Sequence, residues 1–160
     1  MILFEIILRE HEEIFIQEKA LPLIFNNIIE EDQEEKVRIL TNGFESIIHD
    51  SMYEEDRLYQ YYDVFKNLRK TEIARLQQIY NEENQDQVTF TMGNFSFDGI
   101  SIDYIDNKLE RQGLIRSQLI IDGGDFSDLN YEPERPKKHI TQFGKDFIKF
   151  FRKRNLSDNH

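Results

Sequence analysis

Two side chains on one predicted helix surface are of types that read nucleic-acid bases. Asn107 and Arg111 are four residues apart, and by helical rotation both lie opposite the apolar stripe of a predicted helix over residues 102–112. An amide can bond an adenine edge and a guanidinium a guanine edge. Asp103 and Glu110 share this face, and carboxylates approach phosphates unfavourably. The pattern therefore predicts either DNA readout or a solvated or protein-contacting face.

More cations follow toward the C-terminal end. Lys137 and Lys138 lie beside a predicted return strand, where the wing of a DNA-binding domain would touch the backbone of the duplex. A solvated basic end is the alternative, because cations near a helix C-terminus complement its dipole. A third reading is pairing with the acidic front of a second copy. The candidate nucleic-acid or partner contacts are Asn107, Lys108, Arg111, Arg135, Lys137, Lys138, Arg152, Lys153 and Arg154.

Signatures of catalysis and of metal binding are weak. Glu45 and His49 have the four-residue spacing of two ligands on one helix, but no further ligand is spaced to complete a site. The chain lacks a Gly-rich phosphate loop, a GxSxG elbow and an HExxH sequence. We therefore expect a non-enzymatic protein with no cofactor, no metal and no identifiable small-molecule site. A metal-dependent enzyme using carboxylates hidden among the 31 acidic residues stays an alternative.

The charge of the chain is unevenly distributed. The 160 residues have a formal net charge of −11. Residues 1–60 contain 15 acids and 5 bases, a balance of −10, whereas residues 61–160 have a balance of −1. A nucleic-acid backbone should be repelled by the front and only weakly attracted by the rear.

Cellular location is constrained only loosely. The chain has no cysteine, which excludes disulfides and thiolate sites and fits a reducing cytoplasm. Its apolar start contains Glu5 and no basic region, so we expect no signal peptide. No uncharged apolar run reaches the roughly 20 residues that cross a bilayer. The sequence thus predicts a cytoplasmic protein without a membrane contact.

The rear of the chain predicts a helix–strand–strand–helix order. Ser101 is a good N-cap for the helix over 102–112, and Gly113 is typical of a left-handed helix end. A strand over 117–121, a long loop over 126–136 and a return strand over 137–141 follow. A closing helix capped by Thr141 has Phe side chains at helical spacing. Leu109, Leu114 and these Phe residues should share one core.

The front predicts helices separated by short breaks. Pro22 marks a break or a new first turn, and Gly43 a kink or a close helix crossing. Val88–Met92 and Phe95–Phe97 alternate like the strands of a hairpin around Gly93-Asn94. Helices are expected over 1–19, 23–29, 32–50, 53–68 and 71–82, the last capped by Thr71.

The segments EIARL, LERQGLI and ITQFGKDFIKFF, in this order around two strands, resemble winged-helix domains. In many of these a hydrophobic–Thr–x–x–Gly segment joins the wing to a closing helix, as Ile140–Gly144 does here. With its helical acidic front, the layout is similar to Abi-alpha-like proteins linked to bacterial abortive infection. The predicted fold is α+β and mainly helical. An acidic helical region (1–68) precedes a winged-helix-like unit with a β-hairpin (69–154) and a frayed tail (155–160).

Two functions from different classes follow from these patterns. The first is a non-enzymatic interaction or sensor protein, related to phage defence by the resemblance, that contacts a protein partner or a second copy. The apolar residues 1–8 favour it. The second is a DNA-binding regulator that uses the rear unit on duplex DNA. A scaffold helix should directly precede a recognition helix, and the predicted hairpin over 88–97 stands in its place.

Overall fold

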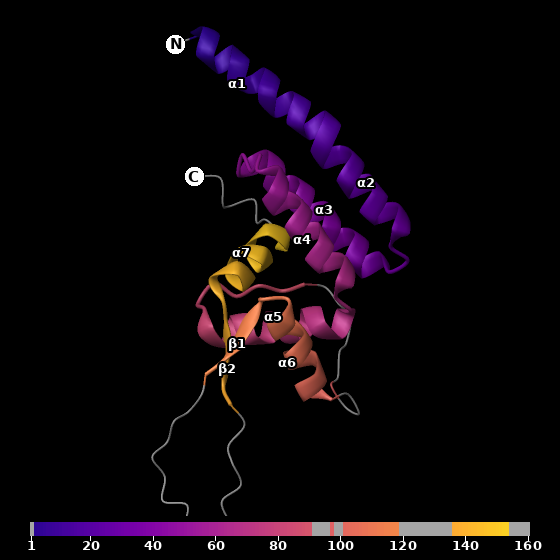
Figure 1. The fold of residues 1–160 in the computed structure, drawn as a ribbon, viewed down its shortest axis with the longest axis vertical. Coiled ribbons are helices and arrows are strands. Elements are labelled where there is room, and N and C mark those ends of the chain that lie inside the picture. The colour runs from indigo at the N-terminus through magenta and orange to yellow at the C-terminus, as the bar shows by residue number, and fades with distance from the viewer. Residues whose placement is uncertain (1, 91–96, 98–100, 119–135, 154–160) are drawn as a thin grey trace, which may run out of the picture.

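The computed structural model describes residues 2–90, 97, 101–118 and 136–153, and only the backbone of residues 2–7. These residues form a mainly helical protein with one small antiparallel sheet, as the sequence predicts at this coarse level. Figure 1 shows α5, α6 and the two strands at one end and the N-terminal helix along the other. The elements are α1 (Ile2–Phe15), a π-helical turn (Ile16–Ala20), α2 (Leu21–Glu30), α3 (Glu34–His49), α4 (Glu55–Asn67), α5 (Lys70–Glu83), α6 (Ile102–Arg111), β1 (Ile115–Ser117), β2 (Lys138–Ile140) and α7 (Gln142–Phe151).

The chain begins with one long helical path, in which α1, the π-helical turn and α2 follow without interruption (Figure 1). Pro22 lies in the first turn of α2, so the predicted new turn forms without a break. The π-helical turn precedes Pro22, and its last hydrogen bond runs from the Leu21 N–H to the Ile16 carbonyl. Proline is tolerated there because a first-turn N–H has no partner within its own helix.

The central packing joins the front helices to α7. Gly43 on α3 confirms the predicted close crossing, since a Cβ there would lie 2.9 Å from the rings of Phe150 and Phe151. Tyr62 on α4 contacts both rings, with centroid separations of 6.0 and 5.5 Å. The Ser46 hydroxyl donates to the Phe150 carbonyl at 2.6 Å, which satisfies a carbonyl at the end of α7.

One cluster of buried side chains extends across the predicted boundary at residue 68. Leu109, Leu114 and Phe147 all belong to it, as predicted, together with Leu40 and Tyr61 from the front helices. The Tyr61 and Phe147 rings meet edge to face at 5.8 Å. Because these contacts are shared, the front helices contribute part of the core on which α7 rests.

Helix α5 begins two residues earlier than its predicted cap implies. Its N-cap is Arg69 rather than Thr71, and the Arg69 N–H donates to the Glu72 carboxylate at 2.6 Å. The backbone N–H of Glu72 bonds back to the Arg69 carbonyl. Glu72 is the third residue of the helix, and its side chain and backbone both bond to Arg69. These two hydrogen bonds stabilise the first turn without a Ser or Thr cap.

The residues after α5 differ from the predicted hairpin where they are described. Residues 88–90 form no strand, and their polar groups bond to α5 instead. Asn81 bonds both the N–H and the carbonyl of Val88, and the Phe90 N–H donates to Gln77. Val88 and Phe90 are buried in the core. The alternation of Val88 and Phe90 thus reflects two buried residues whose backbone groups bond to α5, and it does not reflect a strand. Residues 91–96 of the predicted hairpin lie outside the described part.

Helix α6 and the sheet follow the predicted order with a shifted strand. Ser101 accepts from the Tyr104 N–H, and Gly113 has a φ of +73°, as their types predict. Strand β1 starts two residues earlier than predicted, because Ile115 is buried and pairs with Ile140. It runs antiparallel to β2, with Arg116 opposite His139 and Ser117 opposite Lys138. Residues 119–121 of the predicted strand lie outside the described residues.

The contacts of the turn into α7 explain why Thr141 and Gly144 occupy their positions. Thr141 caps the helix by accepting from the Gly144 N–H at 2.9 Å, as predicted. A Cβ at Gly144 would come within 2.1 Å of the Leu114 carbonyl oxygen. Within the described ranges, every helix is too short or too polar to pass through a bilayer.

Candidate functional site

The predicted contact face of α6 is exposed only in part. Asn107 and Arg111 are exposed, and Tyr104 is 60% exposed on the same helix. Asp106 is instead buried, with its side chain 4% exposed. The outer surface of α6 therefore presents one amide, one guanidinium, one aromatic ring and the Asp103 carboxylate.

Three of the predicted contact cations are held by acids or carbonyls of the protein itself. Lys108 donates to the Asn67 carbonyl at 2.6 Å and to Glu72 at 2.7 Å. Lys138 lies 3.2 Å from Glu110, and Arg152 lies 3.5 Å from Asp86. These cations stabilise junctions between elements, so their availability to an external phosphate is reduced.

Two of the remaining predicted residues lie at one hollow. Asn107 and Lys137 line a hollow of about 490 Å³ between α5, α6 and the start of β2. Lys153 is exposed after α7. Arg135 and Arg154 lie outside the described residues. The assignment of these residues as a contact site stays a prediction.

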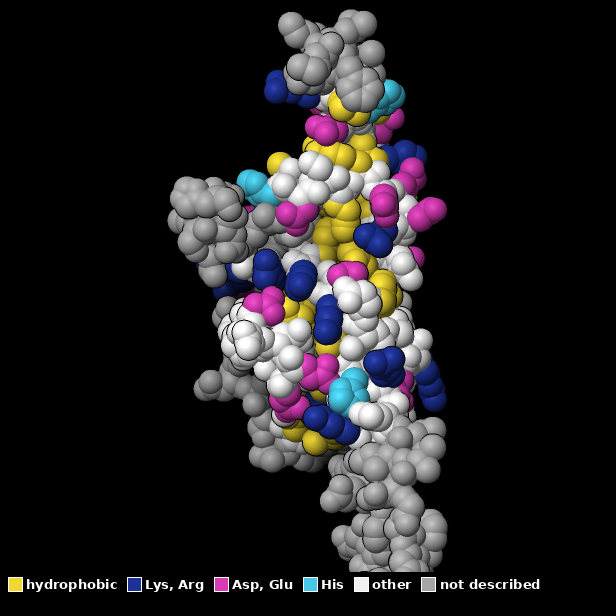
Figure 2. Space-filling view, turned by 90° about the vertical axis from the view of Figure 1, so that its left-hand side faces the viewer, with side chains coloured by type: hydrophobic (Ala, Val, Ile, Leu, Met, Phe, Trp, Pro, Cys, Tyr) yellow, Lys and Arg dark blue, Asp and Glu magenta, His cyan; other side chains and the backbone are white. Residues whose placement is uncertain are grey.

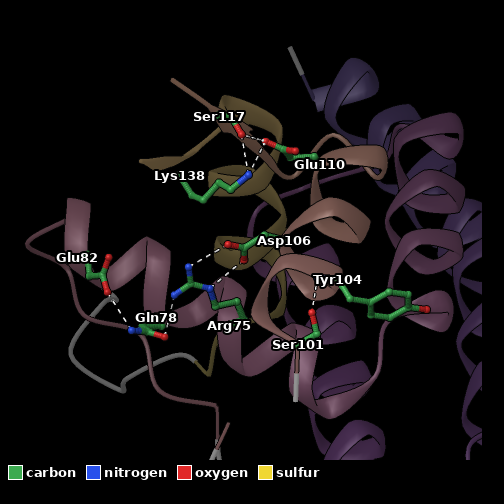
Figure 3. A network of polar contacts seen from close by, with 9 residues as sticks. All are labelled: Arg75, Gln78, Glu82, Ser101, Tyr104, Asp106, Glu110, Ser117 and Lys138. Atoms are coloured by element: carbon green, nitrogen blue, oxygen red, sulfur yellow. Dashed lines mark hydrogen bonds and ion pairs between the residues drawn. The ribbon is translucent and has the colours of Figure 1, made fainter. Parts of the chain in front are cut away.

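A buried ion pair that the sequence did not single out lies at the base of this hollow (Figure 3). Arg75 on α5 donates to both oxygens of Asp106, at 2.9 and 3.1 Å. The hydrogen bond with Asp106 raises the pKa of the Arg75 guanidinium. This two-pronged geometry suits a planar guanidinium and a carboxylate. It fixes α6 against α5.

A second cluster joins α6 to both strands (Figure 3). Ser117 on β1 donates to Glu110 and accepts from Lys138 on β2 at 2.6 Å. The Ser117 hydroxyl, followed by Lys138, lowers the pKa of Glu110 despite some desolvation. A serine beside a lysine can be a nucleophile when the amine is neutral. Here the Ser117 hydroxyl donates to the Glu110 carboxylate and the Lys138 amine bonds to both, so the three side chains act as a clamp.

His139 turns to the other face of the sheet. Its Nδ1 lies 2.6 Å from Glu83 at the end of α5, and Glu83 also accepts from the Ile140 N–H. These bonds attach β2 to α5. In the part of the chain that the structure describes, His, Asp and Glu side chains form no group of three that could hold a metal ion. Glu45 and His49 are both exposed.

The N-terminal helix presents a different kind of surface. Leu8 and Ile14 on α1 are 45% and 51% exposed, and Phe25 and Ile29 on α2 are 57% and 78% exposed. Figure 2 shows hydrophobic side chains along the upper part of one face, with acidic and basic side chains on both sides. By contrast, Ala20 and Ile24 are buried against the body. The second half of the helical path is thus packed on the body along one side, whereas Phe25 and Ile29 on α2, like Leu8 and Ile14 on α1, are exposed to solvent.

Comparisons with known proteins give no relative for this chain. No protein-family model, no curated protein and no solved structure matches it. The geometry above is therefore the basis for functional inference.

Proposed function

We propose that this chain is a non-enzymatic interaction protein that uses its N-terminal helix to bind a protein partner, and that the partner is a second copy. The observation that carries the proposal is the exposed apolar side of α1 and α2. Leu8, Ile14 and Phe25 are each about half exposed on a helical path that reaches the core through Ala20 and Ile24. Fully burying one such side chain is worth about 1.5–3 kcal/mol.

The rim of this surface favours a protein over a lipid partner. Glu10, Glu12, Glu13 and Glu18 border the apolar positions, whereas Arg9 and Lys19 are the cations of the same stretch. An acidic rim is repelled by an anionic membrane surface. A second copy brings matching apolar residues and, at its rear, the exposed cations Arg111, Arg116 and Lys137. Apolar contact with a charged rim is the usual anatomy of a protein interface.

Mass in solution tests this proposal. We expect sedimentation to give a species heavier than 19.3 kDa that dissociates on dilution. A Leu8→Asp/Ile14→Asp variant should be a folded monomer, because two charges replace exposed apolar side chains. A Glu10→Gln/Glu18→Gln variant of the same helix should still associate, because its apolar side chains are unchanged.

A monomer at concentrations up to about 1 mM, where even a weak contact is populated, would overturn self-association through this helix. Equal association of the original protein and the Leu8→Asp/Ile14→Asp variant would move the contact elsewhere. The layout resembling Abi-alpha-like proteins extends the proposal to phage defence. Phage plating on cells with either form tests that extension, and protection should be lost with association.

We further propose that α5, α6, the β1–β2 sheet and α7 form a winged-helix-like unit. The order of these elements and the close approach of Gly144 to Leu114 support it. A DNA-binding role is the second candidate function, favoured by the exposure of Asn107 and Arg111 on α6. The pairing of Lys108, Lys138 and Arg152 within the protein weighs against it.

A further inference from the structure

A hollow of about 440 Å³ lies where α2, α3, α4 and α6 meet. Its charged lining is positive, although the first 60 residues have a balance of −10. Four cations and two acids face it: Lys36, Lys66, Arg69, Lys108, Glu30 and Glu31. A cluster of cations in an acidic region attracts an anionic group at short range.

The donors of this cationic hollow are not used up by the protein. Lys36 is 5% exposed, pairs with Glu31 at 2.5 Å and lies 5.4 Å from the centre of the Phe65 ring. An ammonium has three N–H groups, so Lys36 and Lys108 each retain donor capacity. Lys66 pairs with Glu30 in an exposed contact, which is weak and exchangeable.

A second hollow, of about 520 Å³, adjoins the first. Gln33 and Arg69 line both, so they form the wall between the two. Tyr104 and Ile105 line the second hollow. Tyr104 is 60% exposed, and Figure 3 shows its ring directed away from the Arg75–Asp106 pair. An exposed aromatic ring offers a stacking surface to a flat base.

We propose that these adjoining hollows bind a nucleotide. The phosphate lies in the cationic hollow beside Arg69 and Lys36, and the base stacks on Tyr104. Each volume is in the range of small-ligand pockets. This site uses none of the exposed residues of α1, so it stands or falls independently of the self-association proposed above.

Calorimetric titration of the full chain with AMP, adenosine and inorganic phosphate tests the assignment. We expect AMP to bind with a dissociation constant below about 1 mM, and adenosine and phosphate each to bind roughly tenfold more weakly. Binding of AMP should weaken as salt is raised, because the phosphate contacts are partly solvent-exposed.

Two variants separate the halves of the site. Arg69→Gln should weaken AMP roughly tenfold, the worth of one charge-assisted hydrogen bond, and leave adenosine unchanged. Tyr104→Ala should weaken AMP and adenosine and leave phosphate unchanged. Both residues take part in the first turns of their helices only through their backbone groups, so both variants should fold. Lys153→Gln, an exposed cation far along the chain, is the matched control.

Absence of AMP binding at about 1 mM would overturn the proposal. AMP bound no better than inorganic phosphate would reduce it to an anion site and remove the nucleotide assignment. Unchanged AMP affinity in both Arg69→Gln and Tyr104→Ala would place the ligand elsewhere and would overturn it equally.

Discussion

Gly144 occupies a position where a side chain has no room. The Leu114 carbonyl oxygen would lie 2.1 Å from a Cβ, and backbone cannot move aside as a flexible side chain can. The same turn holds Thr141, whose hydroxyl donates to the Gly113 carbonyl at 2.7 Å. The Thr–x–x–Gly spacing is thus explained by one cap and one close approach.

We expect Gly144→Ala to lower the free energy of unfolding by about 1–3 kcal/mol, the usual cost of overpacking. Urea unfolding followed by circular dichroism measures this change. Lys149→Ala, at an exposed position on the same helix, should change stability by less than about 0.5 kcal/mol. Equal midpoints for the two variants would mean that the backbone yields at this contact.

The Arg75–Asp106 pair shows how burial changes the role of a charge. Only 15% of the Arg75 side chain and 4% of the Asp106 side chain are exposed. Removing one partner leaves the other charge buried without a partner, whereas replacing both with apolar side chains leaves an apolar contact. The pair therefore contributes more to the specificity of the packing between α5 and α6 than to the net free energy of folding.

We expect Asp106→Ala to lower the free energy of unfolding by roughly 2–4 kcal/mol, because the guanidinium loses its buried partner. The double change Arg75→Met/Asp106→Leu should recover most of that loss. Thermal and urea unfolding of the three proteins measure both values. A double variant as unstable as Asp106→Ala would contradict the desolvation argument.

At the scale of elements, α6 is attached to its neighbours by side chains of alternating charge. Asp106 contacts α5, Lys108 contacts the end of α4 and the start of α5, and Glu110 contacts both strands. These three residues lie at every second position, and together they bond to the end of α4, to α5 and to both strands. Such contacts orient a short helix whose apolar stripe alone leaves rotation and sliding free.

The Glu110 clamp makes the stability of the sheet depend on pH. The lowered pKa of Glu110 means that the unfolded chain takes up the proton first. Its contribution is complete above the usual value of 4.5 and is lost as pH falls through the lowered pKa. We expect Glu110→Gln to reduce the loss of stability between neutral and acidic pH, measured by urea midpoints. The exposed control Glu45→Gln should keep the slope of the original protein.

Whole-molecule charge argues against a nucleic-acid partner. A net charge of −11 repels phosphates at long range, and three of the predicted contact cations are paired internally. Exposed Asn107 and Arg111 alone supply few phosphate contacts.

We therefore expect no binding to duplex DNA near 50 mM salt, where nonspecific binders are strongest, in a fluorescence anisotropy titration. Salt-dependent binding that weakens in Arg111→Ala and in Lys137→Ala/Lys138→Ala would contradict this expectation. Such a result would make the DNA-binding regulator the better reading of the rear unit.

From the sequence alone, local patterns correctly predicted the helices, the Ser101 and Thr141 caps, the turn at Gly113 and the antiparallel return of β2. Caps, glycine turns and apolar stripes act over a few residues, so they can be read along the chain. The strand predicted from Val88 was wrong in residues 88–90, because Asn81 and Gln77 on α5 take their polar groups.

Only the tertiary structure decided which charges are internal and which face solvent. Asp106 and Lys108 are ordinary helix residues in the sequence, and their partners Arg75 and Glu72 lie 31 and 36 residues away. The cationic hollow likewise combines residues from four helices. Coulomb and hydrogen-bond energies depend on distance in space and on burial, and neither quantity can be obtained from the number of residues between two positions. The sequence therefore determined the elements, and packing determined the sites.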